Sequence, residues 1–250
     1  MSDKMITIET PDGAAEAYVA RPDDAPGPLP GVLLIMDAFG LRPQIERMAD
    51  RIASWGYVVL APNVFYRWGT AAELAPAGDL TDEERAKFLT EAMPRVRALT
   101  EDLATPDLSA YLDALHGLDG VAAGDIGVTG YCMGGRLALL AAVTRPDVVG
   151  AVGLFHTGGL VTDQPTSPHR RLTDVRADLL AVHADNDRSL PPQAVAEFEH
   201  ALTSAGVTHS ASVYPGALHG YTMADTAVYH HDAAEYHYAE LEKLFAHNLC

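Results

Sequence analysis

The sequence predicts an α/β protein with a mostly parallel sheet, helices on both faces and an N-terminal antiparallel hairpin. Short apolar, β-branched runs alternate along the chain with segments of helical periodicity, as in strand–helix–strand units. Several runs are apolar at every position, which is expected of strands buried on both faces. A length of 250 residues suits one large domain, so we expect residues 1–250 to form a single α/β domain.

The predicted strands are short runs bounded by turn residues. Residues 5–10 and 14–20 flank the turn sequence Pro11-Asp12-Gly13 and predict the hairpin. The apolar run Gly31-Val32-Leu33-Leu34-Ile35-Met36 predicts the first fully buried strand. Further strands are predicted at 57–61, 126–130, 148–155, 178–183 and 210–214.

The predicted helices lie between these runs. Pro43 opens a helix that Gly56 stops, and the sequence from Thr81 to Glu84 resembles a capping box at the start of another. Pro94 is expected to kink or divide that second helix. Residues 64–78 are irregular and rich in aromatic side chains, so they suggest a lid or a pocket wall. Other helices are expected after Gly134 and at about 101–115, 191–204 and 226–247.

Composition excludes several classes of partner. The chain has 17 Lys and Arg against 34 Asp and Glu, a formal net charge of −17, so we expect no nucleic-acid partner and no membrane partner. An anionic substrate would need a local basic pocket. Its two cysteines, Cys132 and Cys250, form no CxxC pattern, which favours a reducing, cytoplasmic location and argues against a cysteine-based metal site.

The stretch with the clearest chemistry is Gly130-Tyr131-Cys132-Met133-Gly134. It reads G-x-C-x-G between a predicted strand and a predicted helix, which is the pattern of a nucleophile elbow with cysteine in place of serine. A helix N-terminus behind the sulfur favours a thiolate. The motif alone is equally compatible with a buried structural cysteine between glycines that allow tight packing.

Two more polar residues follow later strands in the chain order of an α/β-hydrolase triad. Asp187 lies just past the strand at 178–183, and His219 follows the strand at 210–214. The histidine would shuttle the proton of Cys132, and the aspartate would orient the imidazole. Asp187 has an alternative role as a helix cap, and Asp185 is its rival as the triad acid.

Other residues near the predicted strand ends have subsidiary roles. The backbone N–H groups of Ala38 and Met133 are the candidates for an oxyanion hole. His156 is expected to line the pocket, and His183 to pack as a wall residue. The spacing of His230 and His237 would suit a metal, but no carboxylate–histidine motif accompanies it, so we expect neither a metal nor an organic cofactor.

The ordered motifs resemble those of the dienelactone hydrolase family, a branch of the α/β-hydrolase fold. The resemblance covers about residues 7–245 and rests on four stretches: 31–63, G-Y-C-M-G-G at 130–135, D-x-x-x-P at 187–191 and G-x-x-H-G-Y at 216–221. It implies cysteine-dependent hydrolysis of an ester or lactone through an acyl-enzyme, without a cofactor. The best-known members open dienelactones to maleylacetate.

Two positions depart from the dienelactone-opening members. Those enzymes carry a glutamate that helps to generate the thiolate where Asp37 stands here, and a carboxylate-binding arginine where Met223 stands. Asp37 could serve the same role, act through water or only bond its loop. Arg67, Arg85 or Arg136 could supply the missing cation. The residues expected to activate the thiolate or line the pocket are Asp37, Phe39, Tyr66, Arg85, His156, Tyr221 and Met223.

Two hypotheses of function follow. The first is a hydrolase of a small ester or lactone in which Cys132, His219 and Asp187 form the triad. The second is a catalytically weak α/β-hydrolase scaffold that acts as a binding or thiol-redox module. Three polar residues in the correct loops favour the first. Either a monomer or a homodimer is compatible with the sequence.

Overall fold

The computed structural model of the protein describes residues 4–23, 27–185 and 187–249. Its centre is an eight-stranded sheet in the order β1-β2-β4-β3-β5-β6-β7-β8. The strands are β1 (Lys4–Thr10), β2 (Gly13–Ala20), β3 (Gly31–Ile35), β4 (Val58–Pro62), β5 (Ile126–Tyr131), β6 (Val149–Phe155), β7 (Asp178–Ala184) and β8 (His209–Tyr214).

The predicted mixture of parallel and antiparallel strands is confirmed. The hairpin β1–β2 is antiparallel and joins the sheet through the antiparallel pair β2–β4. All the remaining pairs, from β4–β3 to β7–β8, are parallel. The central strands β3, β4 and β5 are buried along their whole length. For β3 this agrees with its uninterrupted apolar sequence.

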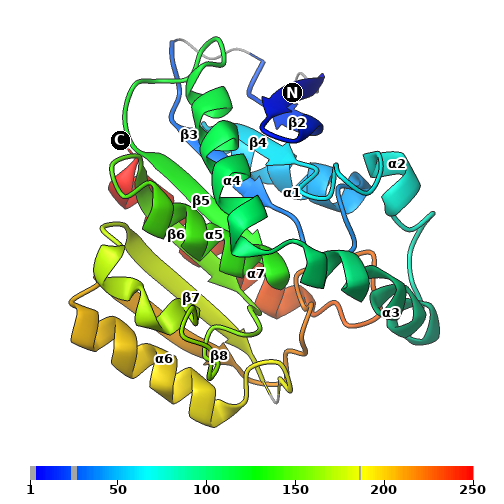
Figure 1. Cartoon of the computed structure of the whole chain (residues 1–250), viewed down its shortest axis with the longest axis vertical. Helices are drawn as coiled ribbons and strands as arrows, with labels where there is room; N and C mark the ends of the chain where they lie inside the picture. The colour runs from blue at the N-terminus through cyan, green and yellow to red at the C-terminus, as the bar shows by residue number, and fades with distance from the viewer. Residues whose placement is uncertain (1–3, 24–26, 186, 250) are drawn as a thin grey trace.

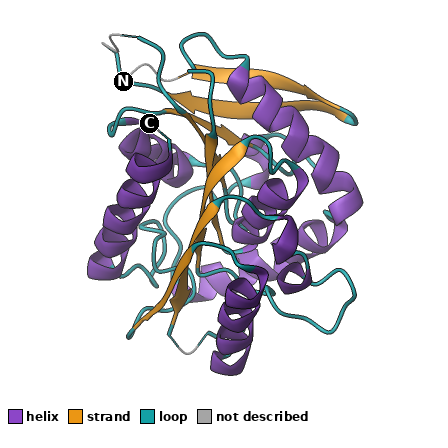
Figure 2. Ribbon diagram, turned by 90° about the vertical axis from the view of Figure 1, so that its left-hand side faces the viewer, coloured by secondary structure: helices purple, strands orange, loops and turns teal. Residues whose placement is uncertain are grey.

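The helices form a layer on each face of the sheet (Figures 1 and 2). Helices α1 and α7 are joined by Arg51, which pairs with Glu235 and lies over the ring of Tyr238. Helix α5 packs on β5 and β6, with α4 beside it, and α6 contacts β8. The helices are α1 (Pro43–Ala53), α2 (Ala71–Leu74), α3 (Asp82–Ala98), α4 (Glu101–His116), α5 (Met133–Thr144), α6 (Pro192–Ala205) and α7 (His231–Asn248).

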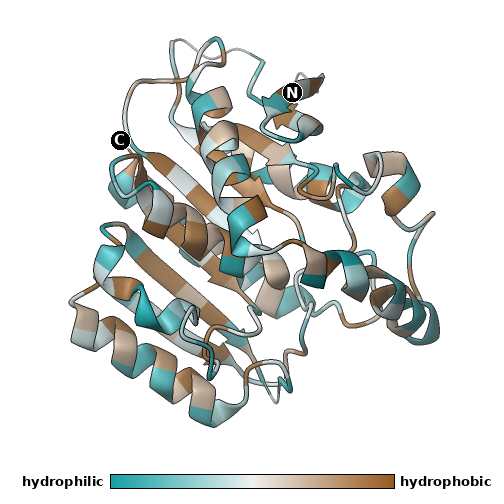
Figure 3. Ribbon diagram, in the orientation of Figure 1, coloured by the Kyte–Doolittle hydropathy of each residue, from teal (hydrophilic) through white to brown (hydrophobic). Residues whose placement is uncertain are grey.

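Hydrophobic residues concentrate along the strands at the centre of the molecule (Figure 3). Helix α5 is buried along most of its length, because it lies between the sheet and α4. No described helix is both long enough and apolar enough to cross a membrane.

Helix α3 differs from its prediction. Its start agrees with the capping box, because the Thr81 side chain accepts from the Glu84 N–H and Glu84 accepts from the Thr81 N–H. Pro94, however, does not divide the helix, which continues to Ala98. A proline removes one backbone hydrogen bond, and the turns on either side of it persist here. The chain instead breaks at Leu99 and Thr100, before α4.

Two other segments also differ. The stretch 64–78 contains a short helix, α2, whose cap residue Thr70 forms a capping box with Glu73. Helix α7 begins at His231, five positions later than predicted, because the preceding residues form turns. The His230 side chain caps this helix by accepting from the Ala233 N–H. Cys250 lies outside the described residues.

Candidate active site

The Gly130–Gly134 stretch forms a sharp turn between β5 and α5. Cys132 has φ 56° and ψ −118°, a conformation that non-glycine residues rarely adopt. The flanking glycines are required by close backbone approach: a Cβ at Gly130 would lie 2.1 Å from the Gly134 carbonyl oxygen, and one at Gly134 would lie 2.3 Å from that of Met36. The turn therefore holds the Cys132 side chain at the N-terminus of α5.

The three residues predicted as a triad meet at the carboxyl edge of the sheet. His219 Nε2 lies 3.0 Å from Cys132 Sγ, and His219 Nδ1 lies 2.6 Å from Asp187 Oδ2. The other carboxylate oxygen of Asp187 accepts from the N–H and the hydroxyl of Ser189, at 2.8 and 2.6 Å. These contacts link a thiol, an imidazole and a carboxylate in series, which is the arrangement that nucleophilic catalysis by a triad requires.

The rival acid, Asp185, has a different contact. Its Oδ2 accepts from the Gly216 N–H at 2.9 Å, and its own N–H donates to the Ala217 carbonyl. Asp185 thus fastens the turn that precedes His219 and makes no hydrogen bond with the imidazole among the described contacts. Asp187 is the carboxylate in contact with His219.

Electrostatics in this trio favour a charged pair. Burial alone would lower the pKa of His219, but negative charge on Cys132 and the hydrogen bond to Asp187 raise it to about 10. Burial likewise opposes ionisation of Asp187, yet its hydrogen bonds to His219 and Ser189 lower its pKa to about 2. The raised pKa of His219 and the lowered pKa of Asp187 favour an ion pair between the protonated imidazole and the carboxylate.

A cavity of about 840 Å³ opens above Cys132. Among the predicted pocket residues, those that line it are Asp37, Ala38, Phe39, Arg85, Cys132, Met133, Arg136, His156, Asp187, His219 and Met223. Met133 is the first residue of α5, so its N–H has no partner within the helix. Ala38 and Met133 therefore border the same space as the sulfur.

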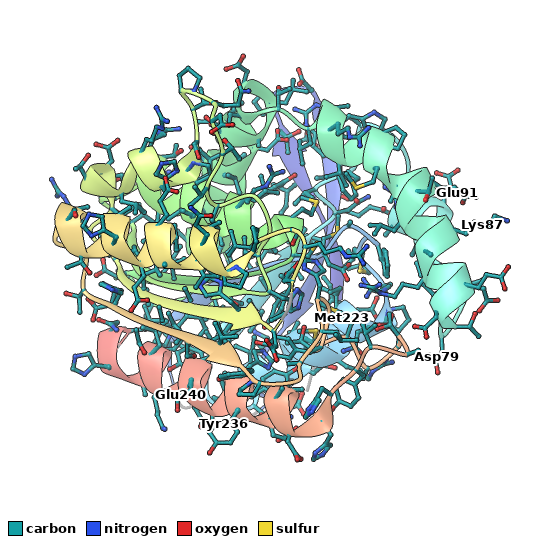
Figure 4. The ribbon with its side chains drawn as sticks, turned by 90° about the horizontal axis from the view of Figure 1, so that it is seen from below. Asp79, Lys87, Glu91, Met223, Tyr236 and Glu240 are labelled. Carbon is teal, nitrogen blue, oxygen red and sulfur yellow. The ribbon has the colours of Figure 1, made fainter. Side chains whose placement is uncertain are left out.

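Helix α3 supplies a wall of this cavity, and Arg85 is the member of that wall that the sequence predicted. Arg85, Leu89, Met93 and Val96 line the cavity and share one helical face. Figure 4 shows Lys87 and Glu91 projecting from the opposite side of α3, away from the molecule. Leu89, Met93 and Val96 were not predicted as lining residues, because no local pattern in the sequence places α3 over the elbow.

The aromatic stretch 64–78 does not supply the expected wall. The Tyr66 hydroxyl donates to Asp107 at 3.0 Å, and Arg67 pairs with Asp107 and Asp12. Neither Tyr66 nor Arg67 lines the cavity among its described residues. These contacts tie the 63–70 turn to α4 and to the β1–β2 hairpin. Tyr66 and Arg67 therefore hold elements of the fold together and do not contact the cavity.

His156 and Tyr221 lie behind the triad. His156 Nε2 is 2.8 Å from Thr222 Oγ1, and its ring packs edge-on against His219 and Tyr221, each at 5.2 Å. Burial, reinforced by the charge on His219, holds the pKa of His156 well below its usual value. Tyr221 is fully buried and does not reach the cavity lining.

The sequence missed a buried charged cluster beneath the cavity. Arg42 donates to both oxygens of Asp37, at 2.6 and 3.1 Å, and to both oxygens of Asp225, at 2.5 and 3.2 Å. Burial opposes its charge, but Asp37 and Asp225 raise the pKa of Arg42. Asp37 also accepts from the Phe39 N–H. Both carboxylate oxygens of Asp37 are thus engaged by Arg42.

Arg42 also lies close to Met223, the position at which the dienelactone-opening enzymes carry a carboxylate-binding arginine. Its Nη2 lies 3.5 Å from Met223 Sδ, and the Met223 side chain is buried. A guanidinium is therefore present beside the position where the dienelactone-opening enzymes carry an arginine, but it comes from the start of α1. Since two carboxylates already occupy it, Arg42 has little capacity to hold a substrate carboxylate.

The two histidines that suggested a metal serve other purposes. His237 is buried, with Nε2 3.0 Å from the Tyr131 hydroxyl and Nδ1 2.7 Å from the Ala234 carbonyl oxygen. His230 caps α7. Within residues 4–23, 27–185 and 187–249, no group of three His, Cys, Asp or Glu side chains is arranged to hold a metal ion.

The sheet order, the elbow and the residues at the strand ends define an α/β-hydrolase. Residues 15–249 match the dienelactone hydrolase family. Since the match spans nearly the whole chain, the protein belongs to this family of hydrolases.

Named relatives and solved structures agree. A "Putative carboxymethylenebutenolidase" of Escherichia coli K12 is 30% identical, covering 88% of this chain and 77% of the relative. One of Yersinia pestis is 29% identical, covering 92% and 82%. The structure of the "Putative Dienelactone Hydrolase" of Klebsiella pneumoniae matches with a TM-score of 0.84 at 25% identity, over 98% of both chains. A dienelactone hydrolase structure from Anabaena variabilis, 20% identical with a TM-score of 0.68 over 100% and 99%, shares the fold.

Proposed function

We propose that the protein hydrolyses small carboxylic esters or lactones through a covalent acyl-enzyme on Cys132. The observation that carries this proposal is the chain of contacts from Cys132 Sγ to His219 Nε2 and from His219 Nδ1 to Asp187, at 3.0 and 2.6 Å. The names of the relatives, which refer to carboxymethylenebutenolidase, support the substrate class.

In the resting enzyme the thiol proton resides on His219 Nε2. The Cys132 thiolate adds to the substrate carbonyl, forming a C–S bond, and the carbonyl electron pair moves to oxygen. The N–H groups of Ala38 and Met133 receive this oxyanion. Collapse breaks the C–O bond, and His219 donates its proton to the leaving alkoxide, which in a lactone stays attached to the acyl group.

Water completes the reaction. Neutral His219 removes a proton from a water molecule, whose oxygen attacks the thioester carbonyl. The C–S bond then breaks, the carboxylic acid leaves, and the thiolate–imidazolium pair is restored. Asp187 keeps the Nδ1 proton of His219 in place through both steps and stabilises the imidazolium.

Asp37 has no step in this mechanism. Both its oxygens are held by Arg42, and one also accepts from the Phe39 N–H. We propose that Asp37 fixes the loop carrying the Ala38 N–H, while the imidazolium of His219 stabilises the thiolate.

The test is acyl trapping on Cys132. With p-nitrophenyl acetate, rapid quenching and mass spectrometry should find an acetyl adduct on the Cys132 peptide, and Cys132→Ala should abolish turnover while keeping the native circular dichroism spectrum. Full activity in Cys132→Ala would refute the proposal. Sulfenic acid or a mixed disulfide at Cys132 without turnover would instead favour the thiol-redox scaffold.

A further inference from the structure

A second cavity of about 450 Å³ lies beside the catalytic one, on the α4 side of helix α5. Its floor is apolar, formed by Leu137, Leu140 and Val143 of α5 and by Leu99 at the α3–α4 junction. The loop after β6, which contains Thr162 to Pro168, lies across from them. Its volume falls within the range of about 300–1,000 Å³ typical of small-ligand pockets. The catalytic steps above make no use of it.

Cations surround this apolar space. Arg97, Arg136 and Arg171 line the cavity, together with one carboxylate, Glu101. Glu101 is engaged by Arg171, whose Nη1 lies 3.1 Å from its Oε2. No hydrogen bond or ion pair engages Arg97 or Arg136 in the described part of the chain. In a protein of net charge −17, two cations without a protein partner at one apolar cavity indicate complementarity to an anion.

Arg136 lies where the two cavities meet. It lines both, as do Met93, Val96 and Gly159. It is half-buried, and its side chain lies against the Gly159 backbone, where a Cβ would be 3.5 Å from Arg136 Cδ. Arg136 comes one helical turn after Cys132 on the first turn of α5. A partly desolvated guanidinium can bind a carboxylate in bidentate fashion.

We propose that the second cavity is a binding site for an amphipathic carboxylate, whose apolar chain lies on the α5 floor and whose carboxylate pairs with Arg136. A guanidinium would also suit a phosphate group. The choice of carboxylate rests on the proposed function, because hydrolysis at Cys132 releases a carboxylate into the cavity that Arg136 shares. Such a ligand is a free acid bound beside the nucleophile and is not the acyl group on the sulfur.

The binding test uses decanoate with the Cys132→Ala variant, so that it does not depend on catalysis. Calorimetry should show saturable one-site binding. Arg136→Gln should weaken decanoate binding by about tenfold to a hundredfold, the effect of removing a charge-assisted hydrogen-bond donor. Arg176 is exposed and lines neither cavity, so Arg176→Gln removes the same charge as a matched control and should leave the affinity unchanged.

Decan-1-ol has the alkyl chain of decanoate but no carboxylate, so it tests the apolar part of the site separately from the ionic part. Its binding should be insensitive to Arg136→Gln, but Leu140→Trp, which fills the α5 floor, should abolish binding of both probes. Thr166→Trp, at an exposed position on the cavity wall, gives the same block if Leu140→Trp does not fold. Decyl phosphate binding more tightly than decanoate would overturn the carboxylate assignment.

Three further results would overturn the proposal: no decanoate binding, equal affinity in Arg136→Gln, or binding that survives both tryptophan variants. Failure of the proposed function gives a different pattern, since decanoate would then bind normally while the wild-type protein forms no acyl adduct on Cys132.

Discussion

At the scale of single residues, the proposed hydrolysis depends most on the charge state of His219, which carries the proton in each step. Negative charge on Cys132 is the leading cause that raises its pKa, to about 10. We therefore expect the pKa of His219 to be lower in Cys132→Ala, where that charge is removed. Titration of the imidazole nitrogens by NMR in both proteins measures this, and an unchanged pKa would show that the sulfur carries no charge at rest.

The same shift makes a prediction about stability. A raised pKa in the folded protein means that protonation of His219 stabilises the fold below its usual pKa of 6.5, and that this contribution is lost as pH rises through about 10. For Asp187 the sign is opposite: its contribution is present above 3.8 and is lost as pH falls through about 2. Denaturant unfolding between pH 6 and about pH 10 should thus show a steeper decline for wild type than for Cys132→Ala.

At the scale of elements, the buried Arg42 cluster joins two loops that carry the site. Arg42 is the N-cap residue of α1, Asp37 follows β3, and Asp225 lies in the segment between His219 and α7. The Arg42 and Asp225 side chains are 2% and 7% exposed, so removing one partner leaves buried charge without compensation. The cluster therefore couples the loop after β3, which contains Ala38, to the segment that follows His219.

We expect Arg42→Met to lower the free energy of unfolding by about 3–5 kcal/mol, because it strands two buried carboxylates. Arg145→Met is the matched control. Arg145 pairs with Asp113 and Asp147, whose side chains are 65% and 67% exposed, and its loss should cost at most about 1 kcal/mol. Equal losses in urea denaturation would contradict the structural role of the cluster.

The elements also show why parts of the site were predictable and others were not. Cys132 follows β5 directly, and Asp187 and His219 lie three and five positions past the ends of β7 and β8. Parallel strands bring their carboxyl ends to one edge of the sheet. The glycines at 130 and 134 left a local signature because only a missing Cβ permits that turn. These residues could be placed from sequence because strand order and local sterics determine them.

Contacts between residues far apart in the sequence could not be predicted from local patterns in the same way. Arg42 meets Asp225 across 183 positions, and no local pattern identifies that pair. Helix α3 lines the cavity with Leu89, Met93 and Val96, and no local pattern predicted that it lies over the elbow. Tyr66 looked like a pocket residue because its stretch is irregular and aromatic, yet its partner is Asp107, on α4. Contacts of this kind depend on how whole elements pack.

At the scale of the molecule, excess negative charge sets the field that a substrate meets on approach. The net charge of −17 acts at a distance, whereas Arg85, Arg136 and Arg188 act only inside or at the lip of the catalytic cavity. Salt distinguishes the effect of the net charge from that of the cavity arginines, since the screening length falls from about 30 Å at 0.01 M to about 8 Å at 0.15 M ionic strength. Contacts inside the cavity are screened much less.

We therefore expect salt to raise kcat/KM several-fold for an anionic ester and to leave a neutral ester nearly unchanged, because screening relieves long-range repulsion. Mono-p-nitrophenyl succinate and p-nitrophenyl acetate form the matched pair, measured at 0.01 and 0.15 M ionic strength. A fall in kcat/KM for the succinate ester would mean that the arginines around the cavity, and not the net charge, dominate the approach. In that case Arg188→Gln, which removes a charge at an exposed lining position, should abolish the fall.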